Sequence, residues 1–128
     1  MERSLVDTNV ILRYLLQDDA ALFKKASAIL EKVKTGERKV IILESVLTEC
    51  VYVLLKVYKI GRPAIADSLR TLFHYKGIVN PDKLDLIDSI GIFSQTNLSF
   101  VECILCAKSK NNAMPLYTFD EELARAAR

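Results

Sequence analysis

Four acidic residues have the chemistry and the spacing of a candidate catalytic centre. Two of them, Asp7 and Asp120, each follow a short apolar run of strand-like composition. The other two, Glu49 and Glu102, lie in or near the first turn of expected helices. Because parallel sheets carry their sites in the crevice at the carboxyl ends of the strands, we expect these four side chains to converge there.

Carboxylates that converge repel one another unless cations lie between them. Hard cations such as Mg²⁺ and Mn²⁺ prefer oxygen ligands and bind through a few carboxylates together with water and phosphate. One or two such ions can polarise a phosphodiester, generate hydroxide and hold the leaving oxygen. This chemistry needs no histidine base, and the one histidine, His74, is predicted to serve in packing or at the surface.

Each acid also has a structural explanation that involves no metal. Helix N-termini attract carboxylates through free N–H groups and the macrodipole, so Asp7 and Asp120 are also candidate N-caps. Ser99 and Glu102 have the spacing of a capping box. Glu49 is flanked by apolar residues, so its carboxylate either faces a polar pocket or is costly to bury unpaired.

Short apolar runs alternate with helical patterns along the whole chain. Strands are expected over 4–6, 39–43, 77–80 and 115–118, and helices over about 10–16, 19–34, 45–59, 63–75, 82–95, 100–110 and 120–128. This alternation predicts an α/β fold, a three-layer α/β/α sandwich with a short parallel sheet of about four strands. A length of 128 residues suits one domain over residues 1–128.

Composition excludes several classes of protein. With 51% hydrophobic and 27% charged residues, the chain can fill a hydrophobic core and still have a well-solvated surface. No apolar stretch approaches the ~20 residues needed to cross a bilayer, and the N-terminus does not resemble a signal peptide. The net charge of +2 does not indicate a protein that holds nucleic acid mainly by charge, so a prediction of RNA binding must come from the site.

The three cysteines indicate a reducing compartment. Cys50, Cys103 and Cys106 are an odd number, which argues against a disulfide framework and favours a cytoplasmic location. Cys103 and Cys106 have the spacing of a redox pair, but they lie in an apolar helical run. We therefore predict that they are buried small apolar side chains.

Residues 7–15, Asp-Thr-Asn-Val-Ile-Leu-Arg-Tyr-Leu, closely resemble the opening of PIN-domain proteins, especially the VapC-like toxins of toxin–antitoxin pairs. Residues 45–49 resemble the second acidic position of that family, residues 98–102 the third and residues 117–120 the fourth. Order and spacing agree over nearly the whole chain, so the combined signal is far more specific than any single acid.

The resemblance implies an α/β/α sandwich, Mg²⁺ or Mn²⁺ as the cofactor, and endonucleolytic cleavage of RNA. It also implies frequent homodimers and inhibition by a small antitoxin protein. By the same match, the metal ligands or water-positioning groups are expected to be Asp7, Glu49, Glu102 and Asp120, with Thr8, Asn9 and Thr118 as supporting residues. On the first helix, Arg13 is the candidate for a contact with RNA phosphate.

Two features depart from the family pattern and support an alternative hypothesis. The third acidic position is usually Asp, whereas this chain has Glu102, one methylene longer. Family members commonly continue into another strand after the last helix, so an exposed sheet edge or a truncated form is expected. Both departures favour a PIN-like module that binds RNA or a protein without cleaving. A phosphatase with Asp7 as nucleophile would need an acid where Asn9 stands.

The expected helix 45–59 is apolar nearly all round. Such a helix is buried on more than one side. Either the core of the chain covers it, or a dimer or antitoxin partner does, and the sequence leaves both explanations open.

Overall fold

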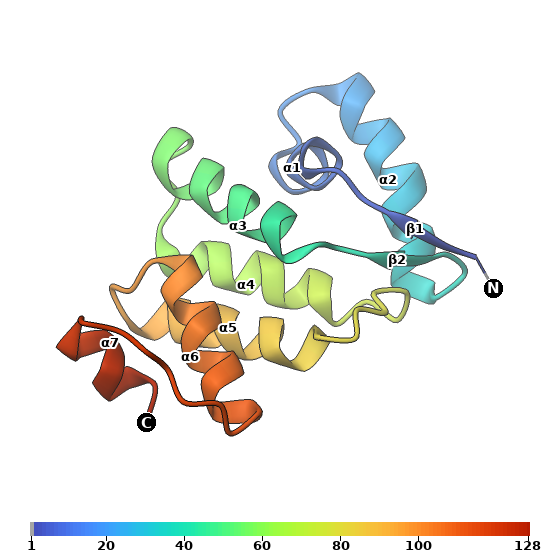
Figure 1. Cartoon of the computed structure of the whole chain (residues 1–128). Coiled ribbons are helices and arrows are strands. Elements are labelled where there is room, and N and C mark those ends of the chain that lie inside the picture. The colour runs from blue at the N-terminus through green and yellow to red at the C-terminus, as the bar shows by residue number, and fades with distance from the viewer. Residues whose placement is uncertain (1) are drawn as a thin grey trace.

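The computed structural model describes residues 2–128, which form a helix-rich α/β fold (Figure 1). In chain order the elements are β1 (Arg3–Leu5), α1 (Thr8–Leu16), α2 (Ala20–Thr35), β2 (Lys39–Ile41), α3 (Glu44–Tyr52), the π-helix η1 (Val53–Val57), α4 (Arg62–Phe73), α5 (Lys83–Gln95), α6 (Phe100–Asn111) and α7 (Glu121–Ala126). The predicted α/β class is confirmed, and each expected helix is present. Within the described range, no helix has the length and apolarity that a bilayer crossing requires.

The sheet is smaller than the sequence predicted. β1 and β2 pair in parallel, and a third segment joins them only through a bridge between Val40 and Ile78. There Val40 N donates to Gly77 O at 2.7 Å, and Val79 N donates to Val40 O at 3.0 Å. Within residues 2–128 the sheet therefore has two strands, and the prediction of about four is wrong.

The fourth expected strand, over 115–118, runs as irregular chain between α6 and α7. Pro115 has no N–H to give to a ladder. The start of the segment is tied to the end of α6, because Met114 N donates to Ser109 O at 3.0 Å and Ser109 Oγ donates to Met114 O at 2.6 Å. Tyr117 is 97% exposed, so its ring adds nothing to the core. Met114, just before this segment, is thus bonded to α6, and residues 115–118 pair with no strand in the described part of the chain.

Capping residues explain where α2 begins and ends, whereas α3 begins without one. Asp19 Oδ1 accepts from Leu22 N at 3.0 Å, and Gly36 ends α2 with a φ of 86°. At α3 the N-cap position belongs to Leu43 and carries no side-chain bond, and Ser45 lies inside the helix. A capping side chain therefore marks the start of α2 but not that of α3.

The core lies where the helices meet the short sheet. Figure 1 shows α1 and α2 grouped beside the two strands, with α4, α5 and α6 stacked on the other side of α3 from α1. Fully buried side chains from these elements form one apolar cluster, which includes Ile11, Leu30, Leu47, Leu69, Phe73 and Phe93. α3 is central to this packing, so the core covers one side of the helix that the sequence showed as apolar all round.

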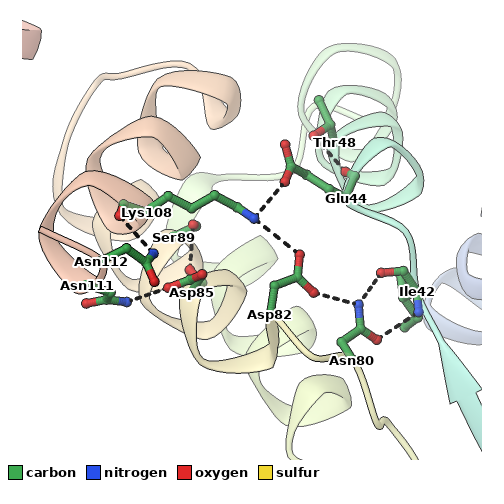
Figure 2. A network of polar contacts seen from close by, with 10 residues as sticks. All are labelled: Ile42, Glu44, Thr48, Asn80, Asp82, Asp85, Ser89, Lys108, Asn111 and Asn112. Atoms are coloured by element: carbon green, nitrogen blue, oxygen red, sulfur yellow. Dashed lines mark hydrogen bonds and ion pairs between the residues drawn. The ribbon is translucent and has the colours of Figure 1, made fainter. Parts of the chain in front are cut away.

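A buried asparagine extends the hydrogen bonding of β2 by one residue. Asn80 is 7% exposed; its Oδ1 accepts from Ile42 N at 2.9 Å and its Nδ2 donates to Ile42 O at 2.6 Å. Nδ2 also donates to Asp82, and Lys108 of α6 lies 3.5 Å from Asp82 and 3.4 Å from Glu44 of α3 (Figure 2). This network ties the end of β2 to α3, to the loop before α5 and to α6.

Replacing Asn80 with alanine is expected to lower the free energy of unfolding by about 2 to 4 kcal/mol, because two buried backbone groups of Ile42 lose their partner. Urea unfolding followed by circular dichroism measures this change. Asn112→Ala is the matched control, because that exposed amide makes one bond, to Lys108 O, and should cost far less. Equal stability losses in the two variants would contradict the role given to Asn80.

Candidate active site

Asp7 lies at the turn where β1 leads into α1. Its backbone is extended, with φ of −80° and ψ of 154°, and its Oδ1 accepts from Thr8 N at 2.9 Å. The carboxylate is exposed, Thr8 is buried beside it, and Asn9 faces solvent. The strand-to-helix turn thus presents a carboxylate at the carboxyl end of β1, while the same carboxylate caps the helix.

Glu49 lies in the second turn of α3 and is exposed, although its neighbours Leu47, Cys50 and Val51 are buried. The apolar residues around Glu49 in the sequence therefore face the core while its carboxylate faces water. Burial, together with the smaller effects of the Glu49 and Asp7 charges, raises the pKa of the Cys50 thiol to about 12. The charges of both carboxylates thus act on the same buried thiol, and the helices that carry them, α1 and α3, pack against each other.

Glu102 forms the capping box that its spacing with Ser99 predicted. Glu102 N donates to Ser99 Oγ at 3.2 Å, and Ser99 N donates to Glu102 Oε1 at 2.9 Å. The side chain is half-buried at the start of α6. One oxygen of this carboxylate is therefore committed to the helix end, and the other has no recorded partner within residues 2–128.

Asp120 caps the short helix α7. Its Oδ1 accepts from Leu123 N at 3.0 Å, and its own N–H donates to Thr118 Oγ1 at 3.1 Å. The carboxylate is exposed. Figure 1 shows α7 at the opposite end of the molecule from α1, which begins just after Asp7. Thr118 thus supports Asp120 through a direct bond, but that pair lies away from the end of β1.

The four acids lie along a row of packed helices. They belong to α1, α3, α6 and α7 or to the residue before them, and each of these helices packs against the next. Among residues 2–128, no three carboxylate, imidazole or thiol groups lie close enough to hold one metal ion. The structure brings Asp7 and Glu49 to one region, and this arrangement does not fit an ion that takes three ligands from the protein.

Arg13, the candidate for a phosphate contact, is engaged within the fold. Its Nη1 donates to both carboxylate oxygens of Asp18, at 2.8 and 2.7 Å, and its Nη2 donates to Tyr58 Oη at 3.2 Å. The buried Nε has no partner in the described part of the chain. A phosphate would have to compete with Asp18 for this guanidinium, so its contact with RNA stays a prediction.

The cysteines agree with their predicted role. Cys50, Cys103 and Cys106 are all free and buried. Burial raises the pKa of the Cys103 thiol to about 11 and also raises that of Cys106. A thiol with a raised pKa stays protonated near neutral pH and is a poor nucleophile. The interpretation of these residues as small buried side chains is confirmed, and neither thiol of the CxxC pair has the low pKa of a redox centre.

A groove beside Glu102 was not foreseen from the sequence. It has a volume of about 440 Å³ and separates α3 and η1 from the region where α5 leads into α6. Its lining includes Tyr52, Lys56, Arg62 and Asn97. No short motif marks these residues; the one local signal was the apolar helix 45–59, which in the structure becomes α3 followed by the π-helix η1.

The PIN domain family matches residues 4–128, nearly the whole chain, and the chain belongs to this family. Comparison with curated proteins gave no significant match, and neither did comparison with solved structures. PIN domains are generally metal-dependent nucleases. The family assignment makes the exposed acids at the end of β1 and on α3 the first residues to test for nuclease chemistry.

The hydrogen bond and the negative charge that Glu102 brings to the start of α6 can be separated by substitution. Glu102→Ala is expected to lower the free energy of unfolding by about 1 kcal/mol, because the backbone N–H of Ser99 loses its acceptor. Glu102→Gln keeps an acceptor oxygen, since glutamine also completes a capping box, and should leave stability nearly unchanged. Urea unfolding of both variants checks this. A glutamine variant as unstable as the alanine variant would mean that the charge of Glu102, and not the bond, stabilises α6.

Proposed function

We propose that this chain hydrolyses phosphodiester bonds within RNA and is the toxin of a toxin–antitoxin pair. The observation that carries the proposal is that α1 packs against α3, with the exposed carboxylate of Asp7 at the start of α1 and that of Glu49 on α3, and that both charges act on the Cys50 thiol. The family match over residues 4–128 supports both a nuclease activity and a single domain over the whole chain. We propose Mg²⁺ or Mn²⁺ as the cofactor, because PIN domains typically use divalent metals.

In this proposal Asp7 and Glu49 are the catalytic carboxylates. Both face water, so either can accept a hydrogen bond from the attacking water and orient it toward phosphorus. Thr8 positions Asp7 through its backbone N–H, and the neighbouring Asn9 offers an exposed amide. We assign assisting roles to Glu102 and Asp120, the latter supported by Thr118.

A second candidate function is RNA or protein binding without cleavage. The arrangement of the acids favours it, because no three metal-binding groups come together within residues 2–128. Glu102 and Asp120 both have complete explanations as helix caps. The two candidates share a binding surface and differ in whether RNA is cut, so one assay separates them.

We also propose a homodimer and a small antitoxin protein as partners. Exposed apolar side chains outside the groove beside Glu102 support protein contacts: Val57 of η1 is 62% exposed, and the adjoining Tyr58 is 39% exposed. Leu22 and Ile29 of α2 line a second groove that also includes Arg13 and Lys25. This groove is mainly apolar with a positive rim, which suits a partner segment that combines apolar and acidic side chains.

The three buried free thiols support a reducing location, for which we propose the cytoplasm.

The nuclease proposal is tested by incubating purified protein with a mixed RNA substrate in Mg²⁺, Mn²⁺ or EDTA. Wild type should cut in either metal and not in EDTA. Asp7→Asn and Glu49→Gln should each slow cleavage by roughly 100-fold or more, because a positioned acid–base group typically contributes that much. Glu37→Gln is the control, since that exposed acid lies in the turn before β2. Wild type that leaves RNA intact in both metals would contradict the nuclease proposal, and binding of the same RNA without cleavage would then support the binding module.

The dimer is tested by sedimentation velocity over a wide range of protein concentrations. We expect a shift from monomer to dimer as concentration rises, because the exposed Val57 and Tyr58 side chains at the end of η1 lose their contact with water on association. A monomer at every concentration would remove the homodimer from the proposal without affecting the cleavage assay.

A further inference from the structure

One wall of the groove beside Glu102 is formed by the end of α3 and by η1. η1 is a π-helix, and Tyr58 N donates to Val53 O, five residues back, at 3.1 Å. A π-turn widens a helix by one residue per turn and is found often at functional sites. Here the wider turn follows Tyr52 and contains Lys56, and both residues line the groove.

The groove offers an aromatic face and an exposed cation. Tyr52 lines the groove and is 61% exposed, so its ring is accessible to a ligand there. Lys56, four residues later, is exposed as well. Asn97, which lines the groove from the α5–α6 loop, adds an exposed amide. An aromatic ring, an amide and a cation in one groove are suited to a base, its polar edge and the adjoining phosphate.

A second cation in the groove is held in a fixed position. The Arg62 guanidinium lies over the Phe93 ring, 3.9 Å from its centroid. Its Nε donates to Phe93 O at 3.1 Å and its Nη2 donates to Leu98 O, while Nη1 has no recorded partner within residues 2–128. A guanidinium held in this way loses little conformational entropy when it binds an anion.

The charges of the lining favour an anionic ligand. Lys56 and Arg62 face one acid, Glu102, and one oxygen of that acid already accepts from Ser99 N. The groove therefore has an excess of positive charge although the chain as a whole is nearly neutral. A second copy of this chain would bring another Lys56 and Arg62 to the same place, so charge favours nucleic acid over self-association.

We propose that this groove binds a nucleotide of single-stranded RNA, with its base against Tyr52 and its phosphate beside Lys56 and Arg62. The inference rests on the proposed function and names its substrate class as single-stranded RNA. Stacked bases in a duplex are paired and not free to lie against a tyrosine, whereas unpaired bases can. Glu102 lies in the lining of the same groove, so a strand bound there reaches one of the candidate acids.

The test measures binding of a short fluorescent single-stranded RNA by anisotropy in EDTA, where metal-dependent cleavage is suppressed. Tyr52→Ala should weaken binding roughly tenfold or more, which is the range for loss of one base–aromatic stack. Tyr52→Phe keeps the ring and should bind within about threefold of wild type. Tyr117→Ala is the matched control, because Tyr117 is 97% exposed and lies outside the groove. A duplex of the same sequence should bind more weakly and be indifferent to Tyr52→Ala.

A salt titration tests the cation. Lys56→Gln should reduce the slope of log Kd against log salt by roughly 0.7, the contribution of one phosphate contact in a single strand. Lys24→Gln, on the exposed face of α2, should leave the slope unchanged.

The outcomes separate the groove from the cleavage reaction. Tyr52→Ala that binds single-stranded RNA as well as wild type would overturn the groove proposal, even if wild type cuts RNA. Tyr52→Ala that only changes the sedimentation of the protein would also overturn it, because the groove would then be an interface between copies of this chain. If binding depends on Tyr52 and Lys56 but wild type cuts nothing, the groove stands and the nuclease proposal fails.

Discussion

The placement of α3 depends on how the two edges of β2 find hydrogen-bond partners. One edge pairs with β1 in parallel over three residues. The other edge is satisfied by the chain around Ile78 and then by the Asn80 side chain, which bonds both backbone groups of Ile42. Buried backbone groups without partners are costly, so this pairing holds the end of β2 in one position. α3 begins two residues after Ile42, and its direction follows from that position.

The same region depends on one glycine. Gly77 N donates to Val33 O at 2.8 Å, and a Cβ at Gly77 would lie 2.0 Å from Arg38 O and 2.6 Å from Val33 O. Only a residue without a side chain can therefore lie against the end of α2 and the start of β2. Because Gly77 O also accepts from Val40 N, the close approach and the bridge to β2 depend on each other.

The acids of the candidate site serve the fold as well as any chemistry. Asp7, Glu102 and Asp120 each accept a backbone N–H at the start of a helix, whereas Glu49 has no recorded bond of this kind. A carboxylate that caps a helix is held in place before a ligand arrives, which lowers the entropic cost of binding. The capping oxygen is also partly occupied, so a strong ligand has to use the other oxygen or compete for the first. This dual use explains why each acid, taken alone, fits both a structural and a catalytic explanation.

Local interactions determined which parts of the structure could be predicted from the sequence. Asp19 caps the start of α2 and Gly36 caps its end, and Ser99 and Glu102 form the predicted capping box at the start of α6. Such caps are visible in the sequence because capping involves residues within four positions of one another. The periodic spacing of apolar residues likewise predicted seven helices and the α/β class. The family match was visible in the order of the acids, which is a property of the sequence alone.

Features that depend on distant partners were decided by the tertiary structure. Residues 115–118 had an apolar pattern like that of the true strands, but a strand needs a neighbour. Instead, Met114 just before them bonds with Ser109, and Thr118 Oγ1 accepts from Asp120 N. Whether Glu49 faces a pocket or water depended on which sides of α3 are covered. The groove between η1 and the start of α6 exists because segments about 45 residues apart pack side by side. The sequence specified which acids are available, and only the packing of α1, α3, α6 and α7 decided how near they lie to one another.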